Sequence, residues 1–317
     1  RHEVIMVLTD KVRSFFQGQL AGWQLAAGNY SSLELAEYRS VDIDGWEVCL
    51  QFNPSRIVSS SAKVDSGSVA SRPCFLCSVN RPEVQSGLDF EGRYEILVNP
   101  YPIFPCHLTI PDISHVPQCI SGRLSDMFLL AEALPGMCVF YNGPKCGASA
   151  PDHMHFQAGN IEKFPIIPEL GRHDCHTVAS VGDARLSVVH GMPYGLFTID
   201  ACTPKAASEA FGMLYAALPC AGGSQEPMMN VLAYAAGAGI VRIVVIPRKR
   251  HRPSFYGTEG EHTMLVSPAS VDMGGLFIMP RRCDFLRMDA VAIKKIFDEL
   301  CYSGRDIEGV VQAVLKK

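Results

Sequence analysis

The sequence predicts an α/β protein with an α+β layout, built from two tandem copies of one unit in which antiparallel strands are covered by a helix. Short apolar segments of strand length flank two amphipathic helical segments, residues 121–134 and 204–218. Both helical segments end in Leu-Pro, at Leu134 and Leu218, and two further strand segments follow each of them. This repeated order predicts an internal duplication.

Composition limits the class of protein. The chain has 317 residues, of which 48% are apolar and 19% charged, which is enough for two packed domains. The formal net charge is −4 and the basic residues are not massed in one tract. This argues against nucleic acid as a partner but allows a local anion site. The apolar runs are too short to span a bilayer, so no membrane partner is expected.

The twelve cysteines are a small share of a long chain whose first residues do not resemble a signal peptide. Most of them lie among apolar neighbours, as buried free thiols do. We therefore expect a reducing compartment, the cytoplasm.

The expected elements follow the duplication. Residues 10–24 have the periodicity of an amphipathic helix. Strands are expected at 46–52, 94–99, 107–111, 137–141, 184–189, 196–199, 229–234 and 240–246, and helices at 288–300 and 306–315. The expected domains are an N-terminal helix (1–30), a catalytic half (31–175) and a degenerate second half with the C-terminal helices (176–317).

The most informative stretch is His153-Met154-His155-Phe156-Gln157. Alternate side chains of a strand share a face, so His153, His155 and Gln157 are expected to line one surface while Met154 and Phe156 enter the core. At the corresponding place the second half has residues 241–245, Val-Arg-Ile-Val-Val. We therefore expect one catalytic and one structural half.

A loop rich in small residues and hydrogen-bond donors, residues 141–152, precedes this stretch. Such a loop can wrap a phosphate chain. A His-x-His pair alone is more often a surface pair or an accidental metal site, but the loop directly upstream favours catalysis. The substrate-binding residues expected in the loop are Asn142, Gly143, Lys145, Gly147 and Ala148.

The chemistry expected of these residues is attack on a phosphorus atom. His155 is the expected nucleophile, with its other ring nitrogen held by a backbone carbonyl near His153. The amide of Gln157 can donate to a non-bridging oxygen without becoming charged. Ser149 and the loop amides can stabilise the remaining phosphate charge.

A second cluster is Cys74-Phe75-Leu76-Cys77. Two such cysteines can give thiolates to a tetrahedral zinc ion, and His107 and His153 are the expected remaining ligands. A redox pair requires a helix directly after the first cysteine, whereas residues 78–82 break helices. A pair of free thiols remains open.

The basic run Arg248-Lys249-Arg250-His251-Arg252 follows a buried strand. Such runs are usually solvated loops. Because this one begins where the strand ends, neutralisation of a sugar phosphate is a second possibility, and the sequence leaves both open.

Residues 147–158 resemble the active-site signature of the histidine-triad superfamily on its transferase branch, in the form found in GDP-hexose phosphorylases of the GDP-L-galactose phosphorylase type. Histidine-triad hydrolases have a third histidine where this chain has Gln157, so the transferase branch fits better. The resemblance implies tandem histidine-triad-like halves and a covalent nucleotide on His155.

The Cys74–Cys77 pair resembles instead the zinc site of galactose-1-phosphate uridylyltransferase, which uses such a pair, a later histidine and the first histidine of the triplet. This resemblance implies His107 and His153 as ligands, Asn99 as a ribose contact, and Phe75 and Leu76 as walls for the base. The spacer between Ser149 and His153 is one residue longer than in that family. Neither family's substrate can therefore be carried over directly.

The expected activity is nucleotidyl transfer from a nucleotide sugar, GDP-hexose above all, to phosphate or a sugar phosphate. A uridylyltransferase and a diadenosine tetraphosphate phosphorylase are alternative enzymes. A non-catalytic nucleotide-binding protein and a zinc-stabilised interaction module are alternatives of another class. A homodimer is possible, and the base, sugar and acceptor are open.

Overall fold

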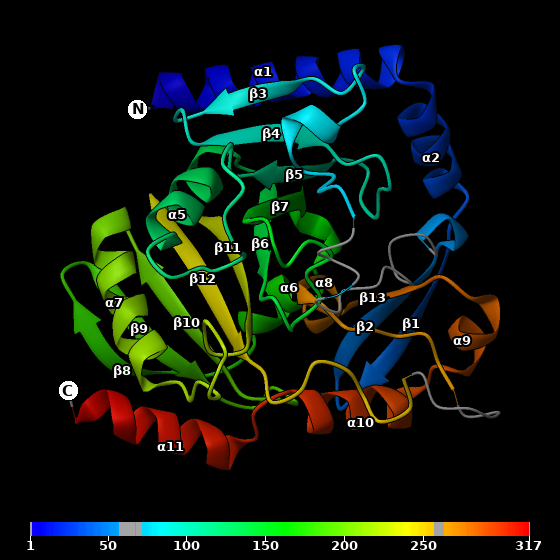
Figure 1. Cartoon of the computed structure of the whole chain (residues 1–317). Helices are drawn as coiled ribbons and strands as arrows, with labels where there is room; N and C mark the ends of the chain where they lie inside the picture. The colour runs from blue at the N-terminus through cyan, green and yellow to red at the C-terminus, as the bar shows by residue number, and fades with distance from the viewer. Residues whose placement is uncertain (1, 57–66, 68–71, 257–262, 317) are drawn as a thin grey trace.

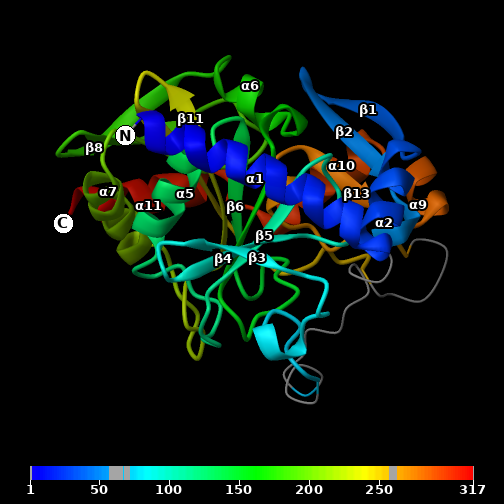
Figure 2. The ribbon, with the colours of Figure 1, turned by 90° about the horizontal axis from the view of Figure 1, so that it is seen from above.

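The computed structural model describes residues 2–56, 67, 72–256 and 263–316, with the backbone alone for 2–8. The chain begins with two helices, α1 (His2–Gly22) and α2 (Gln24–Glu34), separated at Trp23, whose backbone is extended. The helix expected at 10–24 is therefore present but begins earlier. Helix α1 lies along one edge of the molecule, over β3 and β4 (Figures 1 and 2).

The main element is a ten-stranded sheet. Its strands, in spatial order, are β3 (Gly87–Phe90), β4 (Tyr94–Val98), β5 (His107–Pro111), β7 (His155–Asn160), β6 (Met137–Asn142), β11 (Met229–Gly237), β12 (Ile240–Pro247), β10 (Leu196–Ala201), β9 (Ala184–Val189) and β8 (Cys175–Val181). All neighbours pair antiparallel.

The strand order shows the duplication. From one edge inward the first half has the order β3, β4, β5, β7, β6, and from the other edge inward the second half has the matching order β8, β9, β10, β12, β11. The two halves meet where β6 pairs with β11, so they form one continuous sheet instead of two separate ones. The edge strands β3 and β8 were not predicted; they are short or exposed and lack an apolar run.

A second, three-stranded sheet joins distant parts of the chain. Strands β1 (Glu37–Ile43) and β2 (Trp46–Phe52) form a hairpin, and β13 (Leu276–Met279) pairs parallel with β2. The hairpin turns at Asp44-Gly45, both with positive φ, as tight hairpins require. Residues near both ends of the chain therefore build one wall of the molecule (Figure 1).

Helices α5 (Leu124–Ala133) and α7 (Pro204–Ala217) cover one face of the large sheet, and α11 (Gly304–Leu315) packs against α7 (Figure 1). The helix expected at 121–134 therefore begins later, at Leu124, and it has no side-chain cap. The remaining helices of the described residues are η1 (Pro54–Arg56), η2 (Ser78–Asn80), η3 (Ile161–Lys163), α6 (Ile166–Leu170), α8 (Ser270–Met273), α9 (Arg282–Arg287) and α10 (Ala290–Leu300).

Alternation along the strands gives each face of the sheet its own core. On β6, Val139 and Tyr141 pack toward α5 and α7, whereas Cys138 and Phe140 face the small sheet and α10. The second face is where the polar residues of β5, β6 and β7 lie. Within the described part of the chain, no helix is both long enough and apolar enough to cross a membrane.

Candidate active site

The histidine stretch is divided between a strand and the turn before it. Strand β7 begins at His155, and Met154 and Phe156 are fully buried in the core on the helix side, as expected. His155 and Gln157 point to the opposite face, into a shared cavity. His153 lies in the preceding turn, outside the strand. The expectation that it shares their surface is wrong, because strand alternation does not extend to it.

The cavity beside His155 has a volume of about 470 Å³. It is lined by most residues that the sequence singled out for substrate and catalysis: Phe75, Leu76, Asn99, Asn142, Gly147, Ala148, Ser149, His155 and Gln157. Further lining comes from Arg56 and Arg72, which the sequence did not single out, and from His251 and Arg252 of the basic run, for which a phosphate contact is one of two expectations. Gly143 and Lys145 are not in the lining.

The ring of His155 has a fixed tautomer. Its Nδ1 lies 2.8 Å from the carbonyl oxygen of His153, the type of contact expected from the sequence. A carbonyl only accepts, so Nδ1 carries the proton and Nε2 keeps its lone pair. Burial lowers the pKa of His155 to about 4, which keeps the ring neutral. A neutral imidazole with a free Nε2 at a cavity is a nucleophile or a ligand.

The backbone of His155 is clamped by Gln118, a fully buried residue that sequence reasoning missed. Its side-chain oxygen accepts from the amide of His155 at 2.8 Å, and its amide nitrogen donates to the carbonyl oxygens of His155 and Asn142. One side chain thus joins the ends of β6 and β7 where their ladder stops. A lone glutamine in a loop gives no pattern by which to find it.

The glycine loop follows β6 and packs against the segment before α8. Gly147 has φ +100, and a Cβ there would lie 2.4 Å from Cβ of Ala269. Glycine is required by both conformation and space. Nη2 of Arg72 donates to the carbonyl oxygen of Ser149 at 2.6 Å, which ties the loop to the cysteine segment. Lys145 is exposed, and the amide of Gly143 donates to the carbonyl oxygen of Met229.

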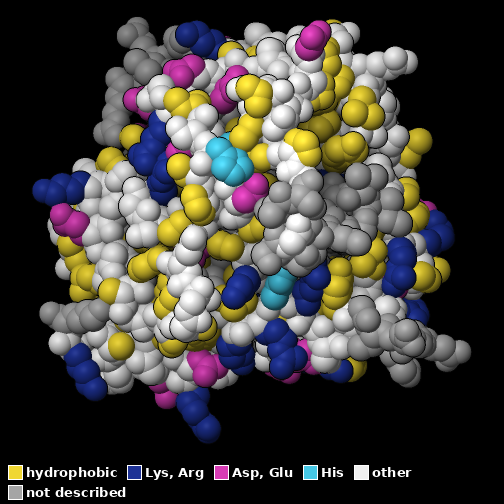
Figure 3. All heavy atoms as spheres, viewed as in Figure 1, with side chains coloured by type: hydrophobic (Ala, Val, Ile, Leu, Met, Phe, Trp, Pro, Cys, Tyr) yellow, Lys and Arg dark blue, Asp and Glu magenta, His cyan; other side chains and the backbone are white. Residues whose placement is uncertain are grey.

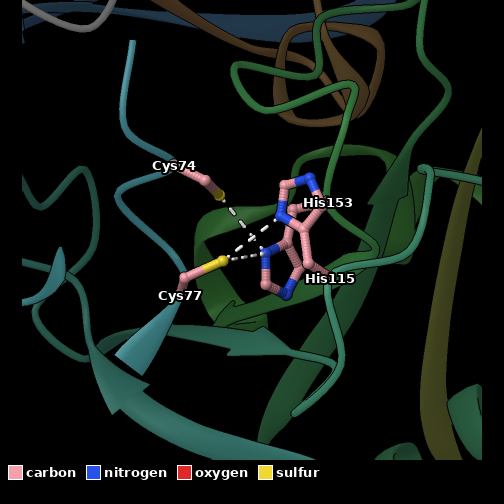
Figure 4. Close-up of side chains that lie close together, drawn as sticks. All are labelled: Cys74, Cys77, His115 and His153. Atoms are coloured by element: carbon pink, nitrogen blue, oxygen red, sulfur yellow. Dashed lines mark hydrogen bonds between the residues drawn. The ribbon is translucent and has the colours of Figure 1, made fainter. Parts of the chain in front are cut away.

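Two cysteines and two histidines converge beside the cavity (Figure 4). Their ligand atoms, on Cys74, Cys77, His115 and His153, lie within 4.8 Å of one another. Sγ of Cys74 is 3.3 Å and Sγ of Cys77 3.5 Å from Nδ1 of His153, and Sγ of Cys77 is 3.2 Å from Nδ1 of His115. Ligands about 2.0–2.3 Å from a tetrahedral zinc ion are separated by similar lengths.

The outer contacts of both histidines also suit a metal. Nε2 of His153 donates to the carbonyl oxygen of Asp112 at 2.8 Å, and Nε2 of His115 lies 3.7 Å from a carboxylate oxygen of Asp152. Such contacts orient ligating imidazoles and fix Nδ1 as the metal-facing nitrogen. The residues present therefore fit zinc.

The expected ligand His107 is not in this cluster. It lies at the start of β5, fully buried, and its Nε2 is 2.9 Å from the side-chain oxygen of Gln157. His115 takes the expected place, because the chain leaves β5 and returns toward Cys77. The sequence pattern requires only a histidine at some distance after the cysteine pair, and His107 and His115 both satisfy it. Only the path of the chain determines which of these two histidines reaches the cysteines.

The cavity lining combines aromatic, apolar and basic groups. Phe75 lies under the guanidinium of Arg72, 5.2 Å from ring centroid to Cζ, and Leu76 and Asn99 also line the cavity. His251 and Arg252 of the basic run line the same cavity. Burial and the charges of Arg252, Arg248 and Lys145 lower the pKa of His251 to about 4. On the face shown in Figure 3, Lys and Arg side chains gather around a histidine in the lower half.

Comparison with known proteins agrees with this architecture. The model of a family described as "Domain of unknown function (DUF4922)" matches residues 15–160. No curated protein matches the sequence. Among solved structures, yeast Ap4A phosphorylase Apa2 is similar in its complex with Ap4A, with a TM-score of 0.58 and 17% identity over 88% of this chain and 96% of that one.

The same yeast enzyme in complex with AMP gives a TM-score of 0.57 and 18% identity over 90% of this chain and 96% of that one. A further Apa2 structure gives 0.54 and 16% identity over 89% and 95%. The chain has the fold of Ap4A phosphorylase. At this level of identity the likeness extends to the fold alone.

Proposed function

We propose that the protein is a nucleotidyltransferase that works as a phosphorylase, with His155 as the residue that becomes nucleotidylated. The observation that carries the proposal is the geometry of His155. Its Nδ1–H is held by the carbonyl oxygen of His153, and the ring borders the cavity. A neutral imidazole fixed in this way presents its lone pair to a bound phosphate.

The reaction proceeds in two displacements. Nε2 of His155 attacks the α-phosphorus, an N–P bond forms, and the bond to the leaving phosphate oxygen breaks with its electron pair on that oxygen. The phosphate leaves as an anion, so no general acid is needed. An oxygen of an acceptor phosphate then attacks the same phosphorus and returns the electron pair to Nε2.

Four hydrogen-bond donors stabilise the charge on the phosphorus oxygens. They are the side-chain amide of Gln157, the hydroxyl of Ser149 and the backbone amides of Gly147 and Ala148, from residues that all line the cavity. A preorganised donor of this kind lowers the barrier by roughly 3–4 kcal/mol when it faces developing charge. Asn142 lines the same cavity.

The chemistry of the lining residues suggests which of them bind each part of the substrate. The aromatic and apolar side chains of Phe75 and Leu76, with Asn99, suit the base and ribose, and His251 with Arg252 suits the leaving or accepting phosphate. No carboxylate of the described residues pairs with Arg252, which leaves its charge available to an anion. Lys145 contributes a more distant positive charge.

A zinc ion bound by Cys74, Cys77, His115 and His153 would cross-link the cysteine segment to the turn that precedes β7. It would hold the backbone of His153, whose carbonyl orients His155. The ion belongs to the scaffold of the site, because His155 lies outside its ligand set.

Two substrate classes fit this chemistry. The sequence signature favours a GDP-hexose, with release of the sugar 1-phosphate. A diadenosine tetraphosphate phosphorylase is the second candidate, and the fold shared with the yeast Ap4A phosphorylase supports it. Both reactions use the same nucleophile and differ in the leaving group.

Mass spectrometry of the intact protein tests the proposal. The protein is mixed briefly with GDP-glucose, GDP-galactose, UDP-glucose or diadenosine tetraphosphate, without acceptor. A mass gain of one nucleoside monophosphate, lost again on addition of phosphate, supports the mechanism and identifies the base. No adduct from any donor in a protein that binds those donors would reject it.

A further inference from the structure

We propose that His107 is a positioning residue that fixes the side-chain amide of Gln157 with its nitrogen toward the cavity. This role rests on the proposed function, since it concerns which atom of Gln157 meets the phosphate. The amide of a glutamine can take two orientations that differ by exchange of oxygen and nitrogen. Only the one with the nitrogen outward donates to a phosphoryl oxygen.

The ring of His107 is held in a closed slot. It lies edge-on to Phe104, with centroids 5.3 Å apart, and stacks on Phe140 at 6.1 Å. Its cross-strand partner is Gly159, where a Cβ would lie 2.2 Å from the ring of Phe104. The glycine therefore makes room for the phenyl ring that confines the imidazole.

The backbone determines the tautomer of the ring. The amide of Ile103 donates to Nδ1 of His107 at 3.4 Å, so Nδ1 accepts and carries no proton. Burial, together with the charge of Arg56, lowers the pKa of His107 to about 3 and keeps the ring neutral. A neutral ring with an unprotonated Nδ1 has its proton on Nε2.

The tautomer in turn determines the orientation of the amide. Nε2–H of His107 donates to the side-chain oxygen of Gln157 at 2.9 Å. The nitrogen of that amide must then point away from His107. Gln157 lines the cavity together with His155, so its N–H groups are directed toward the bound phosphate. The chain of contacts runs from the backbone of residue 103 to the reacting centre.

The first test measures the tautomer in the wild-type protein. A long-range ¹H–¹⁵N correlation spectrum of protein with ¹⁵N-labelled histidine is recorded, and the His107 signals are assigned by their loss in His107→Gln. The expected pattern has the proton on Nε2 and a bare Nδ1. A proton on Nδ1 would reverse the inferred amide orientation and overturn the proposal, whatever the protein's substrate.

The second test is a double-mutant cycle on the rate of nucleotide transfer to His155, measured in a single turnover with each of the four donors named above. Gln157→Ala is expected to slow the step about 100-fold. His107→Leu replaces the imidazole, a hydrogen-bond donor, by an apolar side chain of comparable size. This variant is expected to slow the transfer step roughly tenfold with little change in affinity for the nucleotide substrate. In the Gln157→Ala background, His107→Leu is expected to have no further effect.

Two variants separate positioning from general damage. His107→Gln places an amide N–H near the position of the imidazole Nε2–H and is expected to recover most of the rate. Thr198→Val alters a buried polar residue on β10, the strand of the second half that corresponds to β5, and is expected to leave the rate unchanged.

Additive losses in the double-mutant cycle, or an equal loss of rate in His107→Gln and His107→Leu, would reject the role of His107. No adduct in the wild type would instead reject the proposed function, and the tautomer measurement would then decide alone.

Discussion

Asn142 and Asn230 are cross-strand partners on β6 and β11, at the place where the two halves of the sheet meet. The side-chain nitrogen of Asn230 donates to the side-chain oxygen of Asn142 at 3.1 Å and to the carbonyl oxygen of Cys146 in the glycine loop at 2.8 Å. The side-chain oxygen of Asn230 accepts from Arg248. This pair therefore connects the glycine loop to the start of the basic run.

His155→Ala is expected to abolish nucleotide labelling, with at least a roughly thousandfold loss of turnover, because the N–P bond of the proposed mechanism forms at His155. Nucleotide binding is expected to survive, since the ring is one small part of the cavity lining. His176→Ala is the matched control, because His176 is exposed on β8 at the far edge of the sheet. Near-normal turnover in His155→Ala would contradict the mechanism.

His115→Ala is expected to remove bound zinc, whereas His107→Leu is expected to retain it. The purified protein should contain one zinc ion per chain by elemental mass spectrometry, because four ligand atoms converge at one point. Loss of zinc should also lower the melting temperature, as metal binding is coupled to folding. Retention of zinc by His115→Ala together with its loss from His107→Leu would restore the ligand set expected from the sequence.

Arg252→Ala is expected to weaken use of the phosphate acceptor about tenfold, or about 1.4 kcal/mol, with a smaller effect on labelling of His155. Nε of Arg252 donates to Oγ of Ser267 at 3.0 Å and its guanidinium lies 4.1 Å from the ring centroid of Tyr256, so the charge is held at the cavity. Arg250→Ala is the control, since Arg250 is exposed and lies near Glu299. Steady-state kinetics with varied phosphate concentration measures the difference, and an equal effect of both variants would exclude a specific role.

Stability is expected to depend on the ionisation of Asp272. Burial raises the pKa of this carboxyl from 3.8 to about 6, against the opposing effects of the amides of Ala269 and Ile278 and the charge of Arg248. Arg56 is the other charged group facing it. The folded protein holds the proton more tightly than the unfolded chain, so the contribution is fully present below about pH 4 and is lost as the pH rises through about 6.

Urea unfolding of the wild type and Asp272→Asn across this range measures the effect. The stability of the wild type relative to the variant is expected to fall by up to about 3 kcal/mol between pH 4 and pH 7. The asparagine also loses an acceptor for a backbone amide, but that loss is independent of pH. A constant difference would show that Asp272 titrates normally in the folded protein.

Gly147→Ala is expected to destabilise the fold by about 1–3 kcal/mol and to lower activity, because the new methyl group meets Ala269 and the φ of +100 is unfavourable for alanine. Gly212→Ala is the opposite case. Gly212 lies in α7, and a methyl group there would have no neighbouring atom within 4 Å, so alanine should stabilise by about 0.5–1 kcal/mol. Equal effects of the two substitutions on the unfolding free energy would contradict this account of the loop.

The elements with strong periodicity could be predicted from the sequence, and those without it could not. Strands β6 and β12 and helix α7 are apolar on faces that alternate or repeat clearly, and they lie where expected. The edge strands β3 and β8 have half-exposed, mixed sequences, so their pairing with a neighbour, not their own pattern, makes them strands. The parallel pairing of β13 with β2 joins residues too far apart in sequence for any local pattern to indicate.

The site divides in the same way. The glycine loop is close in sequence to His155 and Gln157, and Cys74 is close to Cys77, so spacing alone grouped them. His115 and Gln118 are isolated in the sequence and reach the site only through the path of the chain. A single polar residue in a loop carries no signal of the group that it will meet.

The sequence by itself indicated the duplicated strand and helix order, which faces of its strands are apolar, and His155, Gln157 and the Cys74–Cys77 pair as candidates for the site. Only the tertiary structure decided that His115 and not His107 joins the cysteines, that the two halves share one sheet, and that His251 and Arg252 line the cavity of His155. The physical reason is that side-chain periodicity reports the burial of a face but not the identity of what covers it. That identity depends on long-range packing of the whole chain.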